Sequence, residues 1–342
     1  MKSLSVVGVD LAKLVFQAHG ASAQGREIFS RRVRREGLLP LMRDLAPTVV
    51  AMEACGGAHY WARRFREMGH EVRLIAPQYV KPFVKTNKND AADAEAIAEA
   101  AVRQNMRFVP VKTVQQQYIQ SLHRIRQGLM VSRVALSNET RGLLAEYGVI
   151  MAKGHRGFVQ GITQLIAGSS TSPDLIEPMR EEAQALLSRY LELQRRIEHY
   201  DEKLKQLAAS QEPCKRLMQI RGVGPLTATA MIAAVGDARM FKNGRQMAAW
   251  MGLVPRQSSS GGKQLLLGIS KRGDRYLRTL LIHGARASLC RAVRQPTRVS
   301  TWATAVADRR GLNKAAVALA NKNARMMWAI LARNEEYRMP AQ

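Results

Sequence analysis

Short apolar runs and helix-period segments alternate along the first 110 residues. Runs rich in β-branched residues predict strands at residues 4–10, 15–19, 26–33, 48–53 and 71–75. Apolar spacing of three and four predicts helices at residues 36–45, 60–68, 78–85 and 90–103. Three strands joined by short turns, followed by strands that alternate with helices, predict a mixed sheet in an α/β domain.

The pattern changes after residue 110 and predicts a helical middle region, with a break at residues 168–173. Beyond the break, apolar residues recur at alternating spacings of three and four, which is a heptad pattern. They are Ile176, Met179, Ala183, Leu186, Tyr190, Leu193, Ile197, Tyr200, Leu204 and Leu207. This predicts a long coiled-coil-like helix. Its seam suits pairing within the chain or between copies, and pairing between copies is the interpretation favoured at this point.

The third stretch, residues 211–342, is expected to be mainly α-helical. Gly222 and Gly224 lie in a turn before a helix-prone run at residues 227–235, a pattern similar to a helix-hairpin-helix element. Glycines allow a tight turn, and free amides at a helix start can bind a phosphate. A plain helix connection is the alternative. Residues 301–342 are expected to be helical and basic, with Trp302 and Trp328 in packing.

Four acidic residues are the strongest candidates for chemistry. Asp10 ends the first predicted strand and Glu53 the fourth, so parallel neighbours would bring both carboxylates to one edge of the sheet. Asp90 and Asp93 are three residues apart at a predicted helix start and share one face. An Asp at a helix start is often only a cap. The four together favour a site for Mg²⁺ or Mn²⁺, because clustered carboxylates repel one another without a cation.

Charge points to a polyanionic partner. The 342 residues include 53 Lys and Arg against 27 Asp and Glu, a formal net charge of +26, which favours binding to nucleic acid. A membrane partner is not expected, because no apolar run approaches the ~20 residues of a spanning helix. Three widely spaced cysteines and no paired metal-ligand spacing fit a cytoplasmic protein without a zinc site.

A serine-rich segment is a candidate for a nucleophile. Ser258, Ser259 and Ser260 precede two glycines in what is expected to be a flexible loop. Basic residues flank it and are candidates to hold phosphate oxygens. They are Arg256, Lys263, Lys271, Arg272, Arg275 and Arg278. The alternative is a linker without a chemical role.

Several motifs occur in an order that resembles the IS110/IS1111 insertion-sequence transposases, also called DEDD transposases or bridge-RNA-guided recombinases. The motifs are Gly-Val-Asp at residues 8–10, Met-Glu-Ala-Cys-Gly at 52–56, Lys-Asn-Asp-Ala-Ala-Asp-Ala at 88–94, Ile-Arg-Gly-Val-Gly at 220–224, Gly-Leu-Val-Pro at 252–255, and the Ser-Ser-Gly-Gly-Lys and Ser-Lys-Arg-Gly segments that follow. The likeness runs over nearly the whole chain.

The resemblance implies a fold in three parts: a ribonuclease H-like (resolvase-like) domain at residues 1–110, a coiled-coil region at 111–210 and a transposase domain at 211–342. It implies that Asp10, Glu53, Asp90 and Asp93 form an acidic tetrad. The family's essential serine directly precedes a glycine, which selects Ser260, with Ser258 and Ser259 as its neighbours.

The resemblance also implies partners and a mechanism. The expected partners are donor and target DNA duplexes, a guide RNA that pairs with both, and further copies of the chain in a dimer or tetramer. The expected reaction is attack of the serine hydroxyl on a DNA phosphodiester with metal assistance, in a site shared between subunits. Basic segments at residues 31–35, 63–66 and 124–133 are expected to contact RNA or DNA, or to be solvated surface.

Two other functions agree with the same residues. A junction-resolving metal-dependent endonuclease would use the acids to activate water and form no covalent intermediate. A non-catalytic nucleic-acid binder would use charge alone. Formation of a protein–DNA adduct separates recombination from both alternatives, because only a protein nucleophile leaves the enzyme joined to the strand.

Overall fold

The computed structural model describes residues 3–85, 89–168, 172–292 and 297–337 and divides into two compact units, Met1–Val114 and Gln115–Gln342. Lys88 of the expected Asp-rich motif and residues 169–171 of the expected break lie outside the described residues. The two units are described separately below.

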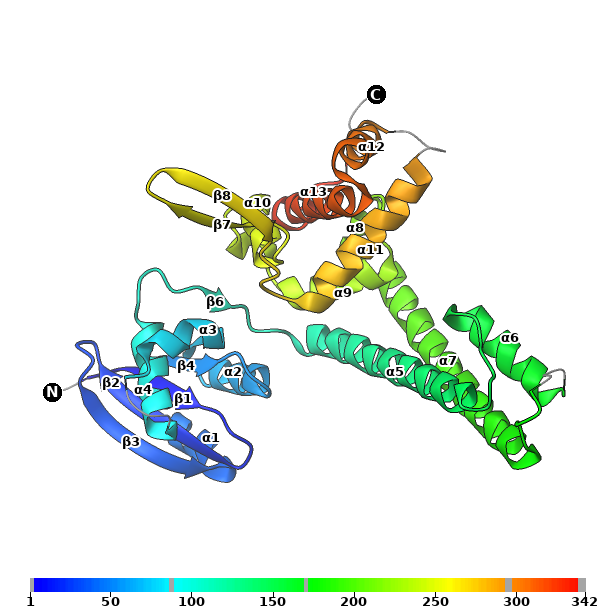
Figure 1. Cartoon of the computed structure of the whole chain (residues 1–342). Coiled ribbons are helices and arrows are strands. Elements are labelled where there is room, and N and C mark those ends of the chain that lie inside the picture. The colour runs from blue at the N-terminus through cyan, green and yellow to red at the C-terminus, as the bar shows by residue number, and fades with distance from the viewer. Residues whose placement is uncertain (1–2, 86–88, 169–171, 293–296, 338–342) are drawn as a thin grey trace. The chain divides into compact units, whose positions relative to one another are not determined.

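The first unit is built on a mixed six-stranded sheet (Figure 1). Its strands are β1 (Leu4–Asp10), β2 (Val15–Ser22), β3 (Glu27–Arg34), β4 (Val49–Glu53), β5 (Glu71–Ile75) and β6 (Phe108–Val109). Their order across the sheet is β3-β2-β1-β4-β5-β6, with β1, β4 and β5 parallel and the others antiparallel to their neighbours. This confirms the expected mixed sheet and agrees with a ribonuclease H-like domain. The short strand β6 was not predicted.

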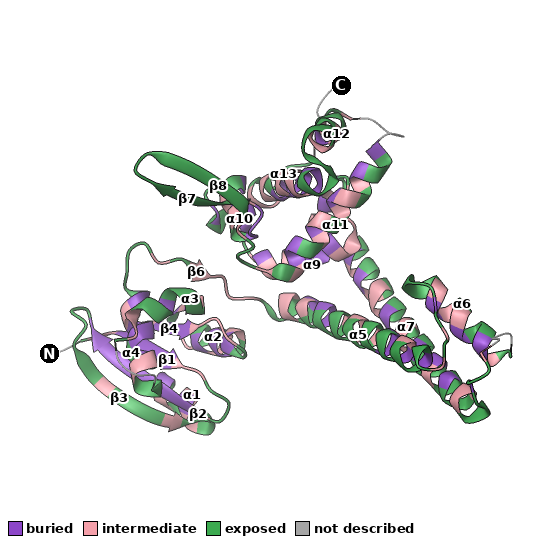
Figure 2. Cartoon of the chain, in the orientation of Figure 1, coloured by how far each residue is buried: buried purple, intermediate pink, exposed green. Residues whose placement is uncertain are grey.

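Helices cover both faces of this sheet. The first four are α1 (Arg35–Arg43), α2 (Ala58–Glu67), α3 (Pro77–Val80) and α4 (Asp90–Ala101), with a 3₁₀ turn at Lys81–Phe83. Leu38 of α1 and Phe65 of α2 pack on one face, and Ile97 of α4 packs on the other. Figure 2 shows the central strands β1 and β4 buried between them, whereas the edge strand β3 is mostly exposed. Burying apolar side chains on both faces explains why the strand sequences read as short continuous apolar runs.

Two long helices dominate the beginning of the second unit. They are α5 (Val114–Ala145) and α7 (Glu177–Ser210), with α6 (Gly154–Ile166) between them in sequence. Leu122 of α5 is buried with Leu204 of α7, and Leu136 is buried with Tyr190, so the two helices run antiparallel. The heptad seam of α7 is therefore filled within the chain, by α5 together with Phe158 of α6 and Leu226 of α9 (Pro225–Val235). The interpretation that this seam pairs copies is replaced by pairing within the chain.

The rest of the second unit is mainly helical. Its elements are α8 (Glu212–Met218), α9 (Pro225–Val235), a 3₁₀ turn (Ala238–Met240), α10 (Gly244–Trp250), β7 (Pro255–Ser260), β8 (Lys263–Ile269), α11 (Arg275–Ala292), α12 (Arg298–Arg310) and α13 (Leu312–Arg333). Leu281 of α11, Ala303 of α12 and Leu319 of α13 share one core with α8, α9 and α10. Among the described helices, none has the length and apolar character needed to span a bilayer.

The serine-rich segment is a β-hairpin and not the flexible loop that was expected. β7 and β8 pair antiparallel, and Ser260 lies directly opposite Lys263 across a two-residue turn. Gly261 and Gly262 make that turn with φ values of 54° and 77°. Two consecutive residues at positive φ match the twist of a tight hairpin, and Gly-Gly adopts them without a Cβ clash. The Gly-Gly pair is the sequence signal of this turn, and Ser-rich composition alone does not reveal it.

Candidate active site

The ends of β1 and β4 bring Asp10 and Glu53 to neighbouring positions. The two strands are parallel neighbours, and Val9 pairs with Met52 immediately before the two acids. Both side chains are half-buried, and each makes an interaction within the structure. This places both carboxylates at the carboxyl edge of the sheet, where open α/β folds usually bind ligands.

The first turn of α4 supplies the other two acids. Asn89, and not Asp90, is the N-cap, since its side-chain oxygen accepts a 2.7 Å hydrogen bond from the Ala92 amide. Asp90 is exposed and Asp93 half-buried, one turn apart on one face. A Cβ on Gly8 would lie 2.2 Å from the carbonyl oxygen of Ala94. Glycine at that position lets α4 pack directly on β1, two residues before Asp10.

Cys55 reports on the charge at the strand ends. Burial raises the pKa of its thiol, and the charges of Glu53 and Asp10 raise it further. The charges of both carboxylates therefore reach the Cys55 thiol. Among the residues that the structure describes, however, no three His, Cys, Asp or Glu side chains converge closely enough to hold one metal ion.

The donor chemistry of the four acids suits a hard divalent cation. All four supply carboxylate oxygens, the ligands that Mg²⁺ and Mn²⁺ prefer. The strand-end pair concentrates negative charge at one edge of the sheet, and negative charge there is what a cation would neutralise. The residues therefore fit such an ion chemically.

The serine hairpin has two distinct faces. Along β7 successive side chains alternate, so Arg256, Ser258 and Ser260 share one face and Ser259 lies on the other. The hydroxyl of Ser259 accepts a 2.8 Å hydrogen bond from the Gln257 side chain. Ser260 is exposed at the end of its strand, with the exposed Lys263 as its cross-strand neighbour. The face with Ser260 thus combines a hydroxyl with cations.

A tight turn fixes the base of this hairpin. Lys271 has a φ of 54°, and a Cβ on Gly252 would lie 2.1 Å from the carbonyl oxygen of Arg272. Arg278 is buried and donates to the carbonyl oxygens of Met251 and Arg272 at 3.1 and 3.0 Å. Lys271 and Arg272 are exposed and available to a phosphate. Arg278 is not, because its guanidinium holds the turn, which corrects its expected role.

The glycine turn before α9 has a packing role. Gly222 has a φ of 85°, and a Cβ there would lie 2.5 Å from the carbonyl oxygen of Gly284 in α11. Glycine is thus required at residue 222 because the backbones of this turn and of α11 are in contact. Gly224 is the N-cap of α9, half-buried, with open space where a Cβ would be. Phosphate binding at Gly222 and Gly224 stays a prediction.

The three basic segments differ in what their side chains contact. In residues 31–35, Arg31, Arg32 and Arg34 lie on the edge strand β3, with most of that strand exposed. In residues 124–133, Arg126 forms a 2.5 Å ion pair with Asp201 of α7, and Arg133 donates to Gln194. In residues 63–66, Arg63 donates to the Lys112 carbonyl at 2.8 Å. These last three stabilise the fold.

The sequence was also compared with known proteins. Residues 7–149 match the DEDD IS110 family model, described as a transposase, and residues 214–299 match the model described as the transposase IS116/IS110/IS902 family. The chain is 48% identical to a probable family 20 transposase of Pseudomonas aeruginosa, over 98% of this chain and 99% of that protein.

Two further relatives cover similar lengths. The chain is 49% identical to the transposase for insertion sequence element IS1111A of Coxiella burnetii, over 100% of this chain and 93% of that protein. It is 38% identical to the transposase for insertion sequence element IS1328 of Yersinia enterocolitica, over 96% and 97%. The similarity therefore spans both units.

Proposed function

The chain belongs to the IS110/IS1111 family of insertion-sequence transposases, and from this premise we propose that it breaks and rejoins DNA through a covalent serine intermediate. The family assignment makes it an enzyme that acts on DNA, and a DEDD family implies use of a divalent metal. The family assignment does not say which residue is the nucleophile, which acids hold the metal or what selects the DNA sites.

The position of Ser260 is the observation that carries this proposal. Its hydroxyl lies at the tip of an exposed hairpin, beside Lys263 and on the face shared with Arg256. Cations at these positions would bind the oxygens of a scissile phosphate and orient it for in-line attack. Ser259 is the poorer candidate, because it lies on the opposite face and its hydroxyl is hydrogen-bonded to Gln257.

The proposed step conserves atoms and charge. The Ser260 oxygen forms a bond to phosphorus, the bond from phosphorus to a sugar oxygen breaks, and the serine proton ends on the departing sugar oxygen. The product is a phosphoserine–DNA ester and a free sugar hydroxyl. Because the ester keeps a phosphodiester-like bond, a hydroxyl from another strand can attack it and rejoin the DNA.

Asp10, Glu53, Asp90 and Asp93 would hold the divalent ion. When bound, Mg²⁺ or Mn²⁺ would neutralise charge on the phosphate and on the attacking and leaving oxygens. The strand register places the backbones of Asp10 and Glu53 at neighbouring positions, and Asp90 and Asp93 of α4 would join them in holding the ion. The acids and Ser260 lie in different units. Because both must act on the same phosphate, the two units that supply them have to meet there. We propose that copies of the chain in a dimer or tetramer share the site.

A guide RNA is the proposed source of sequence specificity. The chain carries a large positive charge but only 6% aromatic residues and no recognisable base-reading motif. Contacts from such a protein would recognise backbones and helix shape, while base pairing with RNA selects donor and target DNA. Sequencing RNA that copurifies with the protein tests this part. A protein that recombines its sites after complete RNase digestion would contradict it.

A denaturing gel with end-labelled donor and target DNA tests the covalent step. The wild-type protein with guide RNA and Mg²⁺ should produce a protease-sensitive protein–DNA adduct. Ser260→Ala should abolish the adduct, and Ser259→Ala, the neighbouring control on the other face, should retain it. Cleavage by Ser260→Ala with wild-type efficiency and no adduct would identify the chain as a metal-dependent endonuclease instead.

A further inference from the structure

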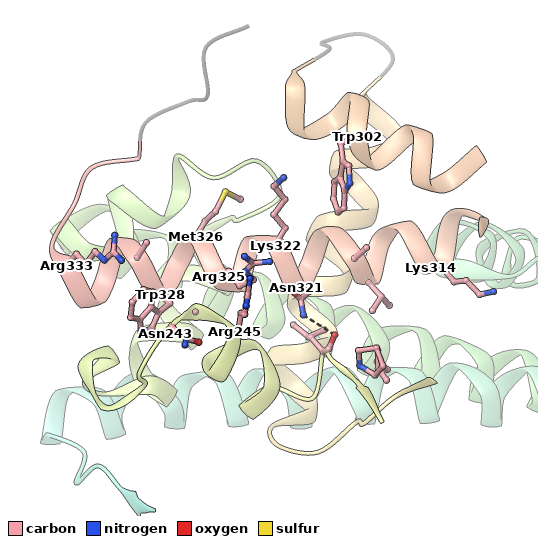
Figure 3. Close-up of a pocket in the computed structure, with 17 residues that line it drawn as sticks. Asn243, Arg245, Trp302, Lys314, Asn321, Lys322, Arg325, Met326, Trp328 and Arg333 are labelled. Carbon is pink, nitrogen blue, oxygen red and sulfur yellow. Dashed lines mark hydrogen bonds between the residues drawn. The ribbon is translucent and has the colours of Figure 1, made fainter. Parts of the chain in front are cut away.

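A cavity of about 920 Å³ lies in the second unit (Figure 3). Side chains of α10, α12 and α13 line it, together with Pro255 and Ile269 at the base of the hairpin. Its size is within the range of known ligand sites, roughly 300–1,000 Å³.

The cavity wall is strongly cationic. Its charged lining residues are Arg245, Lys314, Lys322, Arg325 and Arg333, and no acidic residue belongs to the described lining. Arg333 pairs with Glu335 at 3.6 Å. The other four form no ion pair with an acidic residue in the part of the chain that the structure describes. Like charges gathered around one space favour an anionic occupant.

The fold holds two of these cations close together. A Cβ on Gly244 would lie 2.9 Å from the Cα of Arg325, so glycine lets α10 pack directly on α13. Arg245, the next residue, and Arg325 are consequently near neighbours on the cavity wall, as Figure 3 shows. Both are exposed. Their repulsion is relieved by an anion such as a phosphate, which arginine binds through paired hydrogen bonds.

An indole ring lies at the same cavity. Trp302 of α12, which was expected to lie in packing, is 38% exposed, so part of its ring is accessible. The ammonium of Lys322 lies 4.7 Å from its ring centroid. Trp328, by contrast, donates its indole N–H to the carbonyl oxygens of Ala238 and Phe241, both at 3.1 Å, and packs against the core as predicted. An accessible indole ring next to cations can stack on a base while the cations bind its phosphates.

We propose that this cavity binds an unpaired nucleotide of a nucleic-acid strand, with its base against Trp302 and the adjoining phosphates on Arg245, Lys322 and Arg325. Cations alone would bind a duplex equally well. The aromatic ring favours an unpaired nucleotide over a duplex. Bases in a duplex are stacked on one another and cannot enter a pocket without being unpaired. An RNA bulge and a displaced DNA strand both supply such a nucleotide.

The location of the cavity would place a bound strand near the tip of the hairpin. Pro255 belongs to both the cavity wall and the first position of β7, five residues before Ser260. At ~3.3 Å per strand residue the two lie about 17 Å apart along β7. A strand anchored in the cavity would thus be held a few nucleotides from the hairpin tip. Binding there does not depend on whether Ser260 is a nucleophile.

Photocrosslinking tests the site in full-length Ser260→Ala protein, in which no serine chemistry can interfere. Short oligonucleotides carrying one 5-iodouracil are prepared as single-stranded RNA, single-stranded DNA and duplex DNA, and crosslinked peptides are mapped by mass spectrometry. We expect a crosslink to Trp302 with one or both single strands and at least tenfold less with the duplex. The stronger of the two single strands identifies the source of the nucleotide.

Two paired variants give the control. Arg245→Gln/Arg325→Gln should lose the Trp302 crosslink and lower the slope of log affinity against log salt by about 1.4, or ~0.7 for each phosphate contact on a single strand. Arg189→Gln/Arg196→Gln removes two exposed charges from α7 and should keep the crosslink. No crosslink at Trp302 with either single strand, an equal crosslink with the duplex, or equal loss in both paired variants would overturn the proposal.

Discussion

At the scale of single residues, the hairpin face makes Ser260 the best-placed hydroxyl of the three serines. A serine is a weak nucleophile at its ordinary pKa and depends on its surroundings to hold the phosphate and remove the proton. Lys263 directly opposite provides a positive charge at that position. Arg256 shares the face two side chains away.

Replacing Lys263 tests this arrangement. Lys263→Gln should lower the rate of adduct formation by about 10- to 150-fold, because one charge-assisted contact to the phosphate is lost, worth roughly 1.5–3 kcal/mol. Lys263→Arg keeps the charge and should retain most of the rate. The rates are measured by single-turnover gel assays. Equal rates for the Gln variant and the wild type would show that Lys263 does not contact the phosphate.

A second residue-scale feature is the buried His123. Its two ring nitrogens lie 3.0 Å from the hydroxyls of Tyr276 and Thr229. Burial, and secondarily the charge of Arg126, lower its pKa to about 4, while Asp201 opposes this shift. The imidazole is therefore neutral in the folded protein at neutral pH and joins α5, α9 and α11 through hydrogen bonds.

This predicts a loss of stability in acid. In the unfolded chain His123 binds a proton near pH 6.5, whereas in the folded chain it does so only near pH 4. The unfolded state thus binds more protons between these values, and the free energy of unfolding falls as pH decreases from 6.5 to 4, by on the order of 3 kcal/mol. Urea unfolding at several pH values measures this.

His123→Gln removes the titrating group and should flatten that pH dependence, although it lowers stability at pH 7. His199→Gln, at an exposed position of α7, should leave the pH dependence of the wild type unchanged. A His123→Gln protein that loses stability between pH 6.5 and 4 as steeply as the wild type would show that another group is responsible.

At the scale of elements, the hairpin depends on its glycine turn. An isolated two-stranded hairpin is only marginally stable in water, and here every residue of β7 is exposed. The geometry at its base is fixed by the turn at Lys271 and the hydrogen bonds of Arg278. The tip relies on the positive φ values of Gly261 and Gly262.

Gly262→Ala should therefore reduce adduct formation without unfolding the protein. A non-glycine residue in the left-handed region costs roughly 1–2 kcal/mol, which would shift the hairpin toward open forms. Gly268→Ala is the matched control, since Gly268 lies in β8 with open space around it and no positive φ. The outcome against this account is equal adduct yield from both variants, measured alongside their thermal unfolding.

The sequence predicted the elements whose pattern is local. The strand ends at Asp10 and Glu53 and the helix start at Asp90 follow from apolar periodicity and were placed to within a residue. Partners distant in the sequence were not predictable in this way. A heptad seam does not reveal which helix fills it, so the pairing of α7 with α5 was missed. The buried role of Arg278 depends on carbonyl groups of other segments and leaves no local signal.

Part of the basic cavity has a signal in the sequence. Lys314, Lys322 and Arg325 fall within a narrow arc of α13 at 3.6 residues per turn. That arc predicts a cationic helix face, and only the fold shows that Arg245 and Trp302 complete it.

At the scale of the whole molecule, the account requires the acids of one unit and the serine of the other to act on one phosphate. The α7 seam is filled within the chain, so association between copies must use other surfaces. Subunit mixing tests the shared site. Asp10→Asn and Ser260→Ala proteins should each be inactive alone, and their mixture should recover part of the recombination activity if different copies supply the two groups.

The mixing experiment needs a matched comparison. A mixture of Asp10→Asn with Asp93→Asn should stay inactive. Both substitutions remove an acid, so every set of four acids in the mixture carries one defect. Recovery in this second mixture, or none in the first, would contradict a site shared between copies.

The most direct test of the central claim is the chemical identity of the residue joined to DNA. Wild-type adduct, formed with guide RNA and Mg²⁺, is digested with nuclease and protease, and the remaining phosphate is located by mass spectrometry. The account predicts a phosphate ester on Ser260. Cut DNA with the phosphate on Ser258, on Ser259 or on no protein residue would contradict it.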